Sequence, residues 1–167
     1  VVFIDVDEKV INELNRRREY RVLIKSDDGD SEIIVKNVRG VLASDEEQVL
    51  GELAECQIAA TAVGPHALPG VCAIIAKGLE RRNKKSVDFP LDIILAENLR
   101  DAAAFAEREI AKNLTEPMDI SHLLGLIETS IGKMVPIMPA QLSDSDPLLV
   151  FAEPYNTLIL DKKCFKN

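Results

Sequence analysis

Three short segments follow apolar runs in this sequence, and each lies where a strand would give way to a helix. Asp5 follows the run VVFI, residues Thr61 to Gly64 follow the run QIAA, and Glu97-Asn98 follow LDIILA. In open α/β sheets, ligands bind outside the carboxyl ends of the strands. We therefore expect these three strand-to-helix joints to lie along one rim of a parallel sheet and to frame a dinucleotide site.

Asp5 is the candidate contact to the sugar of a nucleotide. A carboxylate just after the second strand of a dinucleotide-binding fold accepts hydrogen bonds from the adenosine ribose hydroxyls. The same charge repels a 2′-phosphate, so Asp5, with Val6 beside it, favours NAD over NADP. A plain helix cap or a surface aspartate is the alternative interpretation of Asp5.

The second and third joints supply small residues and an amide. Thr61, Ala62, Val63 and Gly64 would let a cofactor lie close to the backbone, and Gly64 suits a tight turn; an ordinary strand-to-helix turn is the alternative. Asn98 is the candidate catalytic residue, because its amide could donate a hydrogen bond to a developing alkoxide or a carbonyl oxygen. It could equally be the N-cap of the following helix, and both roles are compatible.

The elements that must position these residues form an α/β pattern. The sequence predicts a Rossmann-like, mostly parallel sheet with helices on both faces and antiparallel hairpins, with βα units over residues 1–125 and extended strands over 126–167. Val1–Asp5 lacks polar alternation, which predicts a parallel strand buried on both faces. Asp7 is expected to cap a helix that ends near Arg17. Two strands flanking the turn sequence DDGD predict a hairpin.

Six further elements are expected from Gly40 onward. A short strand and the short helix Glu46–Ala54 precede the second joint. A helix after Asn98 should end before Pro117, and a short helix is predicted over Ile120–Leu124. The stretch Leu126–Met138 is expected to be extended. Residues Leu148–Phe165 predict a hairpin that turns at Pro154–Asn156.

Charge argues against a nucleic-acid partner. The formal net charge is −8 and the sequence pI is about 4.8, whereas nucleic-acid binders usually carry a basic footprint. The basic residues Arg81, Arg82, Lys84 and Lys85 are predicted to form a solvated helix end, where cations favour the helix dipole. The carboxylates are predicted to lie mostly on solvated faces.

The cysteines and histidines indicate the redox state and argue against a metal site. Three cysteines and two histidines are widely spaced, which fits reduced thiols in a cytoplasmic protein and predicts no metal site. No apolar run approaches the roughly 20 residues that span a membrane, and the opening residues do not resemble a signal peptide. We expect no membrane partner.

Four segments carry a resemblance to a known family. They are VVFIDVDEKVINELN with the later REY, TAVGPHALPGVCAIIAKGLERRN, LDIILAENLRDAAAF and the closing LDKKCFKN. In this order they resemble the polyol-specific long-chain dehydrogenases, and within them the mannitol-1-phosphate 5-dehydrogenases. The resemblance implies NAD-dependent oxidation of a sugar alcohol or its phosphate, mannitol 1-phosphate foremost, to a ketose without a metal. It also implies that Asp5 holds the ribose, Thr61–Gly64 line the cofactor channel and Asn98 supports the oxyanion.

Departures from the family pattern leave other interpretations open. The family's Gly-rich phosphate loop and its catalytic lysine are not among these residues, so we expect a partial NAD-binding domain over residues 1–167 that is inactive alone. A missing segment or a second copy would complete its sheet. The family's Asp-Arg pair is replaced by Gly132-Lys133, which makes Lys133 a candidate substrate contact. The alternatives are a non-catalytic nucleotide-binding or assembly module, and a related dehydrogenase for a sugar acid such as a hexuronate.

Overall fold

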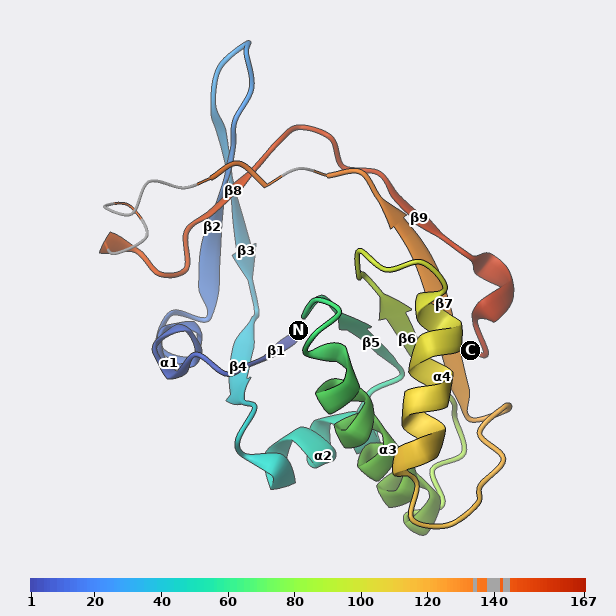
Figure 1. Cartoon of the computed structure of the whole chain (residues 1–167). Coiled ribbons are helices and arrows are strands. Elements are labelled where there is room, and N and C mark those ends of the chain that lie inside the picture. The colour runs from blue at the N-terminus through green and yellow to red at the C-terminus, as the bar shows by residue number, and fades with distance from the viewer. Residues whose placement is uncertain (134, 138–141, 143–144) are drawn as a thin grey trace. The chain divides into compact units, whose positions relative to one another are not determined.

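The computed structural model describes residues 1–133, 135–137, 142 and 145–167. The chain divides into two compact units (Figure 1), and each is described by itself. The first unit comprises Val1–Val49 and Gly132–Thr157, and the second comprises Leu50–Ile131 and Leu158–Asn167. Two segments, the stretch 126–138 predicted as extended and the loop 141–147, lie partly outside the described residues.

Among its described residues, the first unit contains two small sheets and one complete helix. Strand β1 pairs in parallel with β4, and β2 pairs with β3 antiparallel and with β8 in parallel. Its core gathers Ile11 and Leu14 of the helix against Val38 and Leu148. The elements are β1 (Val2–Asp5), α1 (Glu8–Arg17), β2 (Glu19–Ile24), β3 (Ser31–Lys36), β4 (Arg39–Leu42) and β8 (Val150–Ala152). Helix α2 (Glu46–Glu55) begins in the first unit and ends in the second.

Local signals set the ends of α1 as the sequence predicts. Asp7 caps the helix by accepting hydrogen bonds from the backbone N–H groups of Lys9 and Val10, at 2.9 and 3.2 Å. Arg18 adopts a left-handed conformation, with φ of 62°, and its N–H closes the last turn onto the carbonyl of Leu14. This prediction and the predicted hairpin of β2 and β3 are confirmed.

Strand β1 is correctly predicted as a parallel strand, but its predicted burial is wrong. Phe3 is 37% exposed and Ile4 is 42% exposed. Among the described residues β4 is the one strand that pairs with β1, so one of its edges is free. Apolar composition predicts that a strand avoids water, but the neighbours that cover it are set by tertiary structure.

The second unit is built from consecutive βα units. Strands β5, β6 and β7 run parallel, and β9 joins β7 antiparallel. Helices α3 and α4 lie side by side against this sheet (Figure 1). The elements are β5 (Ile58–Thr61), α3 (Leu68–Lys84), β6 (Leu91–Leu95), α4 (Ala102–Asn113), β7 (Leu124–Ile131), β9 (Leu158–Leu160) and the 3₁₀ helix η1 (Lys162–Cys164).

Burial of β6 and one face of α3 forms the core of this unit. Leu91 and Ile93 of β6 are fully buried, as a mostly apolar run predicts for a central parallel strand. On α3, Cys72, Ile75 and Leu79 recur at helical spacing and are at most 4% exposed. Arg82 continues the same spacing, three residues after Leu79.

The prediction of a solvated end for α3 is wrong at Arg82. It is only 4% exposed, and its guanidinium lies over the ring of Phe89, 4.8 Å from the centroid. It donates to the carbonyl oxygens of Leu53, Ala54 and Cys56, at 2.9, 3.2 and 2.9 Å, and to that of Phe89 at 2.6 Å. Arg82 therefore closes the C-terminal turn of α2, whose last carbonyls have no partner within the helix.

Asp92 is an exception to the expectation that the carboxylates lie mostly on solvated faces. It is fully buried on β6 and accepts hydrogen bonds from the backbone N–H groups of Lys166 and Asn167, at 2.9 and 3.1 Å. The side chain of Asn167 adds a third at 3.0 Å. Gly125 on β7 makes room for this carboxylate, because a Cβ atom there would lie 2.1 Å from Asp92 Oδ1.

Two predictions for the last third of the chain are wrong. The expected helix over Ile120–Leu124 is a turn that leads into β7. The expected hairpin over Leu148–Phe165 does not form, because β8 pairs with β2 and β9 pairs with β7. The turn residues around Pro154 were correctly placed outside strands, but the partners of the two strands come from distant parts of the sequence.

Candidate functional site

The candidate site lies at the carboxyl ends of β5 and β6 in the second unit. These strands are parallel neighbours, with Thr61 paired to Leu95 at their ends, so the joints that follow them share one edge of the sheet. Glu128 of β7 pairs with Leu95 and reaches the same edge. We call this the carboxyl edge and define it by Thr61–Gly64, Glu97-Asn98 and Glu128.

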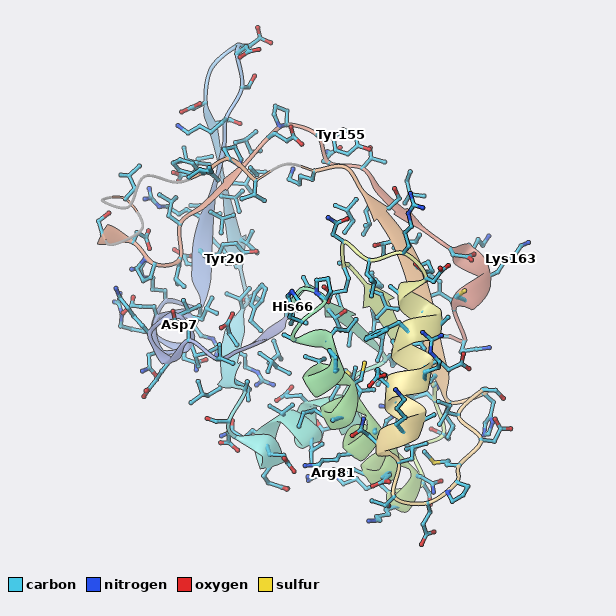
Figure 2. All side chains as sticks on the ribbon, in the orientation of Figure 1. Asp7, Tyr20, His66, Arg81, Tyr155 and Lys163 are labelled. Carbon is cyan, nitrogen blue, oxygen red and sulfur yellow. The ribbon has the colours of Figure 1, made fainter. Side chains whose placement is uncertain are left out.

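The turn from β5 to α3 depends on Gly64. Its φ of +81° lies in the left-handed region that favours glycine. The carbonyl oxygen of Gly64 accepts from the N–H groups of Ala67 and Leu68, at 3.2 and 3.1 Å. Ala67 is the N-cap of α3 and provides no side-chain cap. The labelled His66 stands at this end of α3 and the labelled Arg81 near the other (Figure 2).

Glu97 ties this turn to the next joint. Its Oε1 accepts a hydrogen bond from the N–H of Val63 at 3.1 Å, and its Oε2 accepts one from the N–H of Gly64 at 2.8 Å. The residues involved are 33 and 34 positions apart in the sequence. The structure therefore brings together two of the three predicted joints through a contact that the sequence analysis did not foresee.

Asn98 is exposed and is not the cap of the following helix. Helix α4 begins at Ala102, and its N-cap is Asp101, with φ of 54° and no side-chain cap. Glu128 Oε1 instead accepts from the N–H of Ala103, at 2.7 Å. Among the described residues, the side chain of Asn98 has no hydrogen-bond partner. The N-cap alternative for Asn98 is wrong, and its amide remains available to a ligand.

Thr61 contains an unsatisfied polar atom at the same edge. Its side chain is buried, at 6% exposure, and its hydroxyl oxygen has no hydrogen-bond partner among the described residues. A buried polar group without a partner costs about 1–3 kcal/mol. Such a group is unusual in a native protein, and a bound ligand or water is a common reason for one. Ala62 and Val63 follow it and are exposed, Val63 by 44%.

Asp5 and Val6 belong to the first unit. Asp5 ends β1, and its Oδ1 accepts from the N–H of Asp7 at 2.9 Å. The carboxylate is exposed, and Oδ2 has no hydrogen-bond partner among the described residues. Val6 is 84% exposed. Asp7, not Asp5, caps α1, so the cap alternative applies to the neighbouring residue.

Lys133 is engaged by the backbone of its own unit. Its ammonium donates to the carbonyl oxygen of Glu153 at 2.8 Å and to that of Tyr155. The labelled Tyr155 can be found in Figure 2. A substrate contact through Lys133 would have to replace these two hydrogen bonds.

The cysteines are poor candidates for nucleophiles. Burial raises the pKa of the Cys72 thiol to about 11, and the charges of Glu109 and Glu97 act in the same direction. Burial also raises the pKa of Cys56. A thiolate is the reactive form of cysteine, so these groups remain protonated near neutral pH.

A surface hollow lies along α1 in the first unit. It is lined by Glu8, Lys9, Asn12, Glu13, Arg16, Arg17, Ser145 and Pro147. Its arginines are already paired, Arg16 with Glu13 at 2.6 Å and Arg17 with Asp146 at 2.6 Å. The two arginines are therefore engaged within the protein, and Lys9 is the remaining cation of the hollow.

Within the described part of the chain, no group of three histidine, cysteine, aspartate or glutamate side chains is arranged to hold a metal ion. No helix in the described ranges is long and apolar enough to cross a membrane.

The roles of three side chains were not predicted from the sequence: Glu128, Arg82 and Asp92. Glu128 interrupts the apolar run LGLI of β7, which was the available signal for a polar group at a strand end. Arg82 extends the buried spacing of α3, and that spacing was also visible. Asp92 interrupts the apolar run LDIIL in a similar way, but its partners lie more than 70 residues away and could not be inferred from that signal.

Parallel strands, intervening helices and a polar carboxyl edge define an α/β domain of the Rossmann-like class, and the predicted fold class is confirmed. The fold is shared with Pseudomonas fluorescens mannitol 2-dehydrogenase in ternary complex with NAD and D-mannitol. That comparison has a TM-score of 0.76 at 16% identity and covers 95% of this chain and 42% of that one. A D-sorbitol dehydrogenase in substrate-free form gives a TM-score of 0.73 at 14% identity, covering 96% and 43%.

Residues 1–167 match the family model described as the mannitol dehydrogenase Rossmann domain, and the chain belongs to this family. The mannitol-1-phosphate 5-dehydrogenase of Streptococcus mutans is 35% identical over 99% of this chain. That of Lactococcus lactis is 34% identical over 99%. The chain spans 43% and 42% of the length of these relatives. The family resemblance recognised in the sequence is confirmed.

Proposed function

We propose that this chain is the cofactor-binding part of an NAD-dependent dehydrogenase that interconverts a sugar alcohol, or a sugar-alcohol phosphate, and a ketose. Mannitol 1-phosphate is the foremost substrate, because the relatives at 34–35% identity are named for it. The whole of residues 1–167 would then serve one NAD-binding domain. Bound NAD would supply the hydride acceptor for the alcohol carbon.

The residues of the chain take distinct roles in this proposal. The exposed carboxylate of Asp5, with Val6 beside it, holds the adenosine ribose hydroxyls. Thr61, Ala62, Val63 and Gly64 line the cofactor channel, with the unpartnered Thr61 hydroxyl as a hydrogen-bonding group. These roles follow the positions of the residues at strand ends, where α/β sheets bind nucleotides.

Asn98 is the residue that contacts the reacting oxygen. Its exposed amide, which has no partner among the described residues, would donate a hydrogen bond to the alkoxide that forms as the hydroxyl proton leaves. Donors aimed at developing charge stabilise the transition state more than the substrate. The proton acceptor is assigned to a residue outside this chain, as the family resemblance implies. Lys133 is a secondary candidate for substrate contact.

This proposal rests on the family match over the whole chain. The position of Asn98 supports it, because its amide is available beside the β5–α3 turn that Glu97 holds. Calorimetric titration of the intact protein with NAD, and with ADP-ribose, tests the cofactor. An assay of NAD reduction with mannitol 1-phosphate, mannitol, sorbitol and a hexonate tests the substrate. Binding of NAD with turnover of a polyol or its phosphate is expected. NAD binding without turnover of any of these would favour a non-catalytic nucleotide-binding module, and turnover of the sugar acid alone would favour the hexuronate alternative.

Free strand edges support a further partner or segment. Strands β1 and β5 each pair with one strand among the described residues, and Ile58 of β5 is 57% exposed. We propose that another segment of the intact protein, or a second copy, covers these edges. Sedimentation of the 167-residue chain and of the intact protein would separate the two cases. A cytoplasmic location belongs to the same proposal and fits the three free cysteines.

A further inference from the structure

The carboxylate of Glu97 forms a two-point contact with the β5–α3 turn. Each of its oxygens accepts one backbone N–H, from Val63 at 3.1 Å and from Gly64 at 2.8 Å. Hydrogen bonds to an ionised acceptor are about twice as strong as neutral ones. Gly64 has a φ of +81°, so the turn holds a conformation that few residues adopt, and Glu97 fixes it from the neighbouring strand.

A second carboxylate repeats this arrangement one strand further along the sheet. Glu128 of β7 accepts the N–H of Ala103 in the first turn of α4, at 2.7 Å. In both cases a glutamate on the next βα unit accepts from the backbone that follows the preceding strand: Glu97, just after β6, from the β5–α3 turn, and Glu128, within β7, from the first turn of α4. The segment that contains Asn98 is therefore anchored on both sides, by Glu97 before it and by the Glu128–Ala103 contact after it.

We infer that Glu97 is a positioning residue for the cofactor site, which fixes the β5–α3 turn and the Asn98 segment relative to each other. This inference rests on the proposed function of the carboxyl edge. Preorganised groups are effective because a displacement of about 1 Å in a reactive geometry can lower a rate about a hundredfold. Glu97 has no need to touch the cofactor, since it acts through the backbone of Val63 and Gly64.

The two-point contact also determines what the turn can offer to a ligand. The N–H groups of Val63 and Gly64 are both occupied by Glu97. They are therefore not available to a phosphate group, and the turn can recognise a cofactor through its side chains and carbonyl groups. This geometry argues that the turn lines an uncharged part of the dinucleotide.

The test compares Glu97→Gln with Glu80→Gln in the intact protein. Gln keeps the shape of the side chain but presents an NH₂ group to one of the two N–H donors, so one hydrogen bond is lost. Glu80, on α3, is a matched control: its Oε1 accepts from the N–H and the hydroxyl of Thr115, at 2.6 and 2.8 Å. The same charge is thus removed at a glutamate that also accepts two hydrogen bonds, through one oxygen and away from the carboxyl edge.

Three measurements are made on each variant: hydrogen exchange of the peptide that contains Val63 and Gly64, the Kd for NAD, and steady-state kinetics with the deuterated polyol. For Glu97→Gln we expect faster exchange of these amides and a Kd for NAD raised about tenfold, because the cofactor must then order a turn that has lost about one charge-assisted hydrogen bond. The KM for NAD should rise and kcat should fall with a larger isotope effect, whereas the KM for the polyol stays unchanged. Glu80→Gln should change none of these, because the amide oxygen of Gln can still accept both bonds from Thr115.

The outcomes separate this inference from the proposed function. Faster amide exchange with an unchanged Kd and kcat would show a structural contact only and would overturn the inference. Unchanged exchange would refute the contact itself. If the wild-type protein binds no NAD, the proposed function fails and the positioning role with it, even where the exchange data confirm the contact.

Discussion

The two edges of the β5–β6–β7 sheet differ in whether their polar side chains have hydrogen-bond partners. At the amino edge, where β5 and β6 begin, Arg82 and Asp92 are buried and are surrounded by partners: four carbonyl oxygens for the guanidinium and three N–H groups for the carboxylate. At the carboxyl edge, the buried hydroxyl of Thr61 has no partner among the described residues, and neither does the exposed amide of Asn98. One sheet therefore contains a satisfied end and an incomplete end.

This difference shows how structural and functional polar groups can be told apart. A buried group whose hydrogen bonds are all made stabilises the fold, and its removal should lower stability. A group that lacks partners stabilises nothing in the free protein, and it is the type of group that a ligand completes. Substitutions at the amino edge should therefore affect unfolding, and substitutions at the carboxyl edge should affect binding or rate.

The largest effect is expected for Arg82→Met. Methionine fills part of the space but leaves the carbonyl oxygens of Leu53, Cys56 and Phe89 without a donor, so the free energy of unfolding should fall by about 3 kcal/mol or more. Urea denaturation of the intact protein measures it. Arg108→Met, on the exposed side of α4, is the control and should change stability by less than about 0.5 kcal/mol. Equal effects of the two would show that Arg82 is not an essential donor.

Asn98→Ala should produce the largest effect at the carboxyl edge. Loss of one donor to the developing oxyanion should lower kcat about a hundredfold or more, with the unfolding free energy unchanged. The assay follows NAD reduction with mannitol 1-phosphate. Asn83→Ala is the matched control, since Asn83 is exposed at the far end of α3. Normal turnover by the Asn98 variant would contradict its assigned role, and a large loss of stability would contradict the contrast between the edges.

Asp92→Ala, a substitution at the amino edge, should have an intermediate effect on the free energy of unfolding. The N–H groups of Lys166 and Asn167 would lose their acceptor, and stability should fall by about 2 kcal/mol. Hydrogen exchange should accelerate at these two amides, because the substitution releases the segment that Asp92 holds. Asp88→Ala alters an exposed carboxylate nearby in sequence and should leave both measurements unchanged. Retained protection of the two amides would mean that other contacts hold this segment.

The comparison of β1 and β6 shows how far sequence could predict the fold. Both are short apolar runs, and both were correctly predicted as parallel strands at βα joints. Burial was correct only for β6, which has a strand on each side. Hydrophobic pattern reports what a segment prefers, but burial depends on neighbours that the local sequence does not encode. The same reason explains why β8 and β9 do not form the hairpin that their turn residues predicted.

The strand-to-helix joints of the candidate site could be predicted from the sequence, but the contacts between them could not. Strand ends, a glycine with a positive φ and a polar residue after an apolar run are local features, and they located Gly64 and Asn98. The contact from Glu97 to the Gly64 turn was not predictable, since it depends on the register between β5 and β6. Arg82 was assigned to a solvated helix end because its neighbours are charged, although its spacing from Leu79 placed it on the buried face.

Thr61→Val is expected to have the smallest effect, and it gives the most direct test of the contrast. Valine has nearly the same shape and lacks the hydroxyl, so removal of an unsatisfied buried group should stabilise the free protein by about 1 kcal/mol. The same change should weaken NAD binding severalfold, because the group that completes the hydroxyl would lose its partner. Thermal unfolding with and without NAD measures both effects in one series: the variant should unfold at a higher temperature in the free form and gain less from the cofactor. A variant that is less stable in the free form would show that Thr61 already has a partner in the protein or in bound water. Thr61 would then resemble Arg82 and Asp92, and the carboxyl edge would have to be defined by Asn98 alone.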